Sequence, residues 1–77
     1  MKVSIQIKLY ANLKRFTPPS ADNYVVEKGM TIRQLLEKLE IPTDRIRLIF
    51  INNVKGELDS ILKGEERVGI FPPIGGG

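Results

Sequence analysis

The chemistry open to this chain is limited by the reactive side chains that it has. Its 77 residues include no Cys and no His, which removes thiolate nucleophiles, imidazole bases and the metal sites that either group builds. The acids Asp59, Glu65 and Glu66 lack the pairing of a catalytic dyad and are typical of turns. We therefore expect no metal site, no bound cofactor and no complete enzyme in this chain alone.

The group that remains for chemistry is the carboxylate of the glycine-rich end. Phe71-Pro72-Pro73 leads into Ile74, Gly75, Gly76 and Gly77. Consecutive prolines favour an extended backbone, and glycines without side chains can pass through a narrow channel. A carboxylate is ionised and a poor electrophile, so it must first be activated, most simply as an acyl-adenylate made with ATP, before a nucleophile can attack its carbon. No phosphate-binding loop of the Gly-x-x-x-x-Gly-Lys type is present, so we expect a separate enzyme to use the ATP.

Four segments that could position this end have the pattern of β-strands. In the first, apolar residues alternate with polar ones, which predicts a half-buried strand. The others are rich in β-branched and aromatic residues and are bounded by Gly, Pro or Asn. The predicted strands are residues 3–9, 24–27, 46–51 and 67–71, with a further short strand or turn before the last.

One segment has the pattern of an amphipathic helix. Thr31 and Gln34 have the spacing of a capping box, and Pro42 is expected to end the helix. Between them, one side carries an apolar stripe of Ile32, Leu35, Leu36 and Leu39. A single helix packed across a mixed sheet of four to five strands buries the apolar surface of both. The sequence thus predicts an α+β, ubiquitin-like β-grasp fold for residues 1–71, with residues 72–77 as an extended flexible tail.

Three stretches resemble the MoaD/ThiS family of sulfur carriers. They are residues 7–13, residues 31–36 and, most specifically, residues 62–77, where a Gly-containing acidic turn, a strand, Phe-Pro-Pro and a glycine end follow one another. The resemblance implies that an E1-like enzyme adenylates the terminal glycine and that a sulfur source then forms a thiocarboxylate. By the same resemblance, Gly77 and Gly76 carry the acyl group, and Phe71, Pro72, Pro73, Ile74 and Gly75 position it.

The resemblance also suggests where the sulfur goes. The run Phe71-Pro72-Pro73-Ile74 is more similar to the molybdopterin type than to the thiamine type, which implies the large subunit of molybdopterin synthase as the second partner. The family usually ends in two glycines and this chain has three, which moves the carboxylate outward by ~3.3 Å. Retention of Gly77 with a matched partner and removal of Gly77 before use are both open.

Two other functions are compatible with the same sequence. A ubiquitin-like modifier would form the same adenylate but end in an isopeptide bond to a lysine. A β-grasp interaction domain with an inert tail is the second, because a fold does not determine a function and terminal glycines also occur as frayed ends.

A partner surface is expected on the third strand. Ile49 and Ile51 share one face, opposite Leu48 and Phe50, and Phe71 is expected to join them as a partner-binding residue. The alternative is that Ile49 and Ile51 belong to the core. The net charge is +3 without any basic run, so we expect no nucleic-acid partner, and no segment is apolar enough for a membrane span. We expect a cytoplasmic protein.

Overall fold

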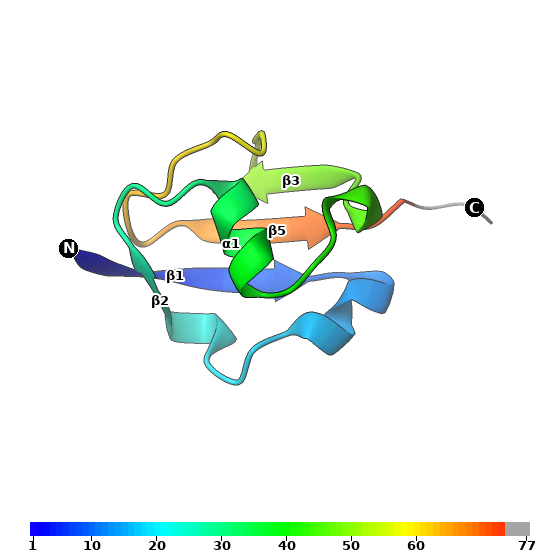
Figure 1. Ribbon diagram of the computed structural model, residues 1–77, viewed down its shortest axis with the longest axis horizontal. Coiled ribbons are helices and arrows are strands. Elements are labelled where there is room, and N and C mark those ends of the chain that lie inside the picture. Colours follow the sequence, from blue (N-terminus) through cyan, green and yellow to red (C-terminus); the bar gives the residue numbers. More distant parts are fainter. Residues whose placement is uncertain (74–77) are drawn as a thin grey trace.

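Five strands form one mixed sheet in the computed structural model, which describes residues 1–73 (Figure 1). The strands are β1 (Lys2–Leu9), β2 (Tyr24–Glu27), β3 (Leu48–Ile51), β4 (Val54–Lys55) and β5 (Arg67–Phe71), in the order β2-β1-β5-β3-β4. The helix α1 (Ile32–Lys38) crosses one face, and the short 3-10 helices are η1 (Ala11–Phe16), η2 (Ala21–Asn23) and η3 (Thr43–Arg45). The predicted β-grasp fold is confirmed.

The centre of the sheet joins the first and last strands. β1 and β5 are parallel, with Ile7 opposite Val68 and Leu9 opposite Ile70, and all four side chains are buried. β5 also pairs with β3 in antiparallel fashion, so it has a neighbour on each side. The alternation predicted for residues 3–9 therefore holds, and it places the apolar side chains of β1 in one core with those of α1.

The helix begins as predicted but ends earlier. Thr31 and Gln34 form the capping box, with the Gln34 N–H donating to Thr31 Oγ1 at 3.2 Å and the Thr31 N–H donating to Gln34 Oε1 at 3.0 Å. The expectation that Pro42 ends the helix is wrong, because α1 ends at Lys38. A Schellman motif ends it: Glu40 has φ +62°, and the Ile41 N–H donates to the Leu36 C=O at 2.9 Å.

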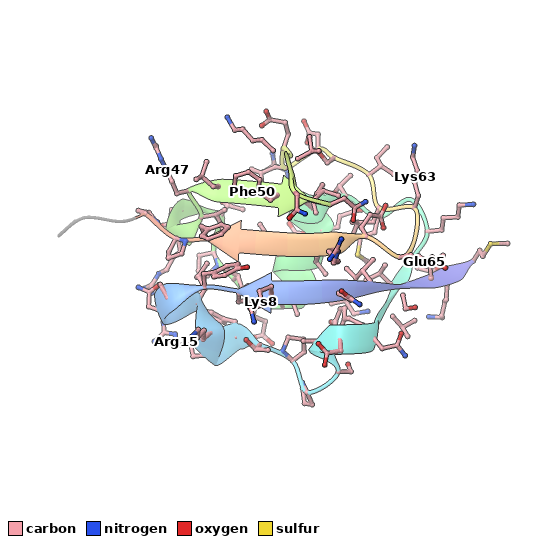
Figure 2. All side chains as sticks on the ribbon, turned by 180° about the vertical axis from the view of Figure 1, so that it is seen from behind. Lys8, Arg15, Arg47, Phe50, Lys63 and Glu65 are labelled. Carbon is pink, nitrogen blue, oxygen red and sulfur yellow. The ribbon has the colours of Figure 1, made fainter. Side chains whose placement is uncertain are left out.

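The two faces of the sheet differ in what covers them. Residues that point toward α1 form the core, together with Leu13 from η1 and Leu62 from the segment before β5. Figure 2 shows the opposite face, where the strands lie nearest the viewer and α1 lies behind them. Within residues 1–73, no helix is both long and apolar enough to cross a membrane.

A buried carboxylate shapes the turn that leads into β5. Glu66 is 7% exposed, and its side chain accepts hydrogen bonds from the Lys63 N–H at 2.6 Å and the Gly64 N–H at 2.8 Å. Its own C=O accepts from the Gln6 N–H at 2.9 Å, which sets the start of the β1–β5 pairing. The sequence assigned this acid to a turn, and the structure shows that it organises the turn.

We expect Glu66→Gln to lower the free energy of unfolding by roughly 1–3 kcal/mol, because an amide offers one acceptor oxygen to two N–H groups and turns its NH₂ toward a donor. Urea denaturation at neutral pH measures the change. Glu65→Gln is the matched control, since Glu65 is exposed in the same turn. Equal unfolding free energies for the two variants would contradict this role of Glu66.

Candidate functional site

β5 delivers the chain to one end of the sheet and stops there. Its last residue, Phe71, pairs with Leu48, and the Arg47 N–H donates to the Phe71 C=O at 2.8 Å. Pro72 and Pro73 follow, and proline has no N–H to continue a strand ladder. Pro72 is buried and Pro73 is exposed. The other predicted tail and acyl residues, Ile74, Gly75, Gly76 and Gly77, lie outside the described residues, so the tail beyond Pro73 stays a prediction.

Three aromatic rings meet at this end, on the face of the sheet away from α1. The rings of Tyr10 and Phe71 are stacked, with centroids 4.1 Å apart and planes inclined by 5°. The edge of one ring of the Phe50–Phe71 pair meets the face of the other at 5.7 Å and 84°. Phe71 alternates with the buried Ile70, and Phe50 lies opposite Gly69, so the strand period brings these rings to one face. We call Tyr10, Phe50 and Phe71 the aromatic cluster.

Ile49 and Ile51 lie on the core side of β3 and not on an exposed partner surface, which is the alternative that the sequence left open. Ile49 is 5% exposed and belongs to the core, and Ile51 is half-buried against it. The register explains this, because Ile49 pairs with Ile70 and Ile51 pairs with Val68, and both of these side chains are buried. Of the three predicted partner-binding residues, only Phe71 lies on the uncovered face.

The outward-facing residues of the same strand are Leu48 and Phe50, which the sequence analysis did not select. Both faces of this strand are apolar, so alternation alone cannot say which one meets the helix. The pairing of β5 with β3 settles the question. Val68 and Ile70 are the buried residues of β5, so Phe71 points the other way and shares a face with Leu48, its partner in β3. This inference needs the register of β3 against β5, which cannot be seen in the sequence.

A shallow groove of about 500 Å³ runs along the uncovered face beside the aromatic cluster. The residues that line it include the basic Lys8 and Arg67 and the acidic Asp22. Lys55 lies opposite Phe50 in the β3–β4 pair and therefore faces the same way. Figure 2 shows Lys8 and Phe50 on this face, with Arg15 and Arg47 near the end where β5 finishes. The face combines an apolar centre with a mainly basic surround.

Comparison with protein families identifies the relatives of this chain. The model of the ThiS family matches residues 7–77, a range that includes the aromatic cluster, most of the residues that line the groove, and the whole glycine end. The chain belongs to the ThiS family. The resemblance drawn from the ending is therefore confirmed at the level of the family. Comparison with curated protein sequences gives no significant match.

Solved structures confirm the fold of this ThiS-family member. The protein HVO 2177 of Haloferax volcanii superposes with a TM-score of 0.76 at 16% identity, covering 99% of this chain and 88% of that one. A Pyrococcus furiosus chain described as a candidate molybdopterin converting factor, subunit 1, gives 0.66 at 22% identity, with 94% and 99% covered. Small archaeal modifier protein 1 of H. volcanii gives 0.67 at 18% identity, also with 94% and 99% covered. At these identities the likeness shows the β-grasp fold.

The geometry of this ThiS-family chain joins two features that a carrier needs. The uncovered face offers apolar and cationic groups for binding another protein, and β5 ends at the edge of that face. The described residues thus bring an uncovered apolar and basic surface together with the end of β5.

Proposed function

We propose that this chain is a sulfur carrier whose C-terminal glycine is adenylated by an E1-like enzyme and then converted into a thiocarboxylate. Its membership of the ThiS family and its Phe-Pro-Pro-Ile-Gly-Gly-Gly ending support the proposal. The observation that carries it is the position of Phe71, which is both the last residue of β5 and part of the uncovered aromatic cluster. Docking and presentation of the tail would then occur at one place.

The proposed chemistry replaces one oxygen of the carboxylate by sulfur. A carboxylate oxygen attacks the α-phosphorus of ATP, a new O–P bond forms, and pyrophosphate leaves. Hydrosulfide then attacks the carbonyl carbon, the bond from that carbon to the AMP oxygen breaks, and AMP leaves with the electron pair. No oxidation or reduction occurs in either step. This chain is the substrate, and the activating enzyme supplies the ATP site.

The partner surface in this proposal is apolar at its centre and acidic around it. Tyr10, Phe50 and Phe71 would bury against the apolar part, since aromatic residues provide much of the binding energy at protein interfaces. Lys8 and Arg67 border the groove and would face acidic side chains, whereas Asp22 brings an acidic group to its lining. Complementary charges of this kind raise association rates and select the partner.

The acceptor of the sulfur in this proposal is the large subunit of a molybdopterin synthase, because the Phe71-Pro72-Pro73-Ile74 run resembles the molybdopterin type. A thiamine-pathway acceptor is the alternative of the same chemical class. A cytoplasmic location is part of the proposal.

The deciding experiment is intact-protein mass spectrometry. The full chain is incubated with ATP, sulfide and a MoaD/ThiS-type activating enzyme, with reactions lacking ATP or sulfide as controls. We expect a mass gain equal to the exchange of one oxygen for sulfur, dependent on both reagents. Lysine-linked adducts of the chain, formed with ATP and without sulfide in a cell extract, would instead support a protein modifier. If several competent activating enzymes yield neither the thiocarboxylate nor the lysine-linked adducts, the proposal is overturned.

A further inference from the structure

We infer that Tyr10 is a positioning residue, whose ring holds Phe71 and so sets the point and direction at which the chain leaves the sheet. The inference rests on the proposed function and adds to it a residue outside the tail. It assigns to the aromatic cluster a second role besides contact with a partner.

Tyr10 is itself held firmly by two backbone hydrogen bonds. Its N–H donates to the Ile70 C=O at 3.2 Å, which extends the pairing of β1 with β5 by one residue. Its C=O accepts from the Leu13 N–H at 3.0 Å, at the start of η1. Leu13 is fully buried, so this second bond connects Tyr10 to the core. The ring of Tyr10 therefore projects from a fixed backbone.

Phe71 needs such a support because the strand ladder stops at it. The Arg47 N–H reaches the Phe71 C=O, but the next two residues are Pro72 and Pro73, which have no N–H to donate. The end of β5 thus lacks further ladder bonds from its own amides. The stacked ring of Tyr10, with centroids 4.1 Å apart, supplies the side-chain contact on the β1 side. Aromatic pairs of this geometry add to stability beyond the area that they bury.

The ring of Tyr10 lies beside Gly69, which has no side chain to displace it. A Cβ at this position would lie 3.5 Å from Cε2 of Tyr10 and 3.9 Å from Cε1 of Phe71. A methyl group there makes ordinary contacts, whereas atoms beyond Cβ would meet the two rings. The two rings therefore lie directly beside this position, and a long side chain here would compete with them for space. This predicts that Gly69→Ala keeps the stack and that Gly69→Leu displaces it.

The consequence for the reaction is a matter of alignment. The carboxylate must meet the α-phosphorus of ATP in an aligned geometry, and small displacements cost large factors in rate. If Tyr10 holds the base of the tail, its loss allows more directions of departure. The rate of adenylation in the bound complex then falls, while binding through the rest of the face is largely kept.

The kinetic test uses Tyr10→Leu, Tyr10→Phe and the control Tyr24→Leu in ATP–pyrophosphate exchange with the activating enzyme. Tyr24 is a half-buried aromatic residue of β2 that packs against the core, away from the cluster. We expect Tyr10→Leu to lower kcat roughly 10- to 100-fold, with a smaller rise in KM because the variant also loses the contact of the ring with the partner. Tyr10→Phe restores the rate because it keeps the ring, and Tyr24→Leu behaves like the unchanged chain. A raised KM with unchanged kcat in Tyr10→Leu would overturn the inference, since Tyr10 would then only contact the partner.

A second measurement needs no partner. Amide hydrogen exchange of Arg47 reports its bond to the Phe71 C=O, and exchange of Gln6 reports the bond to the Glu66 C=O at the other end of the β1–β5 pair. We expect exchange at Arg47 to become several-fold faster relative to Gln6 in Tyr10→Leu and in Gly69→Leu. We expect no such change in the control variants, which are Tyr10→Phe, Gly69→Ala and Tyr24→Leu. An unchanged Arg47-to-Gln6 ratio in Tyr10→Leu would overturn the inference. If the unchanged chain forms no adenylate, the proposed function fails, and this exchange ratio still decides whether Tyr10 holds Phe71.

Discussion

Deletion of Gly76 and Gly77 together is expected to abolish thiocarboxylate formation and to leave the free energy of unfolding unchanged. The stability is expected to stay the same because glycine has no side chain, so removal of Gly76 and Gly77 takes no apolar side chain away from a core. The loss of activity is large because the shortened tail moves the carboxylate back by up to ~7 Å, at ~3.3–3.6 Å per extended residue. Mass spectrometry measures the thiocarboxylate, and urea denaturation measures the stability.

Deletion of Gly77 alone addresses the third glycine. If the partner accepts the family's usual two-glycine end, this variant reacts at least as fast as the full chain. If the partner is matched to three glycines, the variant without Gly77 reacts far more slowly than the full chain. Full activity of the chain that lacks both glycines would contradict the carrier function, because the terminal acyl group would then have no required position.

The second large effect is expected from two neighbouring residues on opposite faces of β3. Phe50→Asp should fold and bind the activating enzyme roughly 30- to 1,000-fold more weakly, since losing a central aromatic contact costs about 2–4 kcal/mol. Ile49→Asp should instead unfold most of the chain, because Ile49 is 5% exposed and a carboxylate there would be buried without a partner. Isothermal titration calorimetry measures the binding, and circular dichroism with thermal melting measures the folding.

Val54→Asp is the matched control for this pair. Val54 is an exposed apolar residue of β4 that pairs with Ile51, so its side chain points to the other face of the sheet from Phe50. We expect this variant to fold and to bind normally. A Phe50→Asp chain that binds as tightly as Val54→Asp would remove the uncovered face from the proposal. A folded Ile49→Asp chain would contradict the register of β3 and β5.

Local patterns in the sequence predicted the elements whose cause is local. The alternation of residues 3–9 and the capping box of Thr31 and Gln34 both depend on neighbours a few positions away, and both are present. The helix end was predicted wrongly because Pro42 is an obvious breaker, whereas the Schellman motif depends on a non-glycine residue, Glu40, taking a positive φ. That conformation is uncommon outside glycine, so the sequence carries little sign of it.

The glycine end is predicted from residue type and stays a prediction, whereas the part of the candidate site that depends on tertiary pairing was missed. The absence of Cys and His and the glycine end are visible in the sequence and directed attention to the carboxylate. The orientation of Ile49 depends on which residues of β5 lie beside it, and the two strands are separated by the whole of β4 and the following turn. Tyr10 was absent from the predicted site for the same reason, since its partner Phe71 is at the other end of the chain.

The parallel pairing of β1 with β5 has a consequence for how the molecule is made. β5 is the last strand to be synthesised, and it fills the gap between β1 and β3 at the centre of the sheet. Contacts between such distant segments form late and slowly, because a long loop must close first. A nascent or broken chain that stops before Arg67 lacks this strand and leaves the inner edges of β1 and β3 unpaired. Such a fragment also lacks the buried side chains of Val68 and Ile70, so we expect the stable fold only in molecules that contain β5 and therefore Phe71.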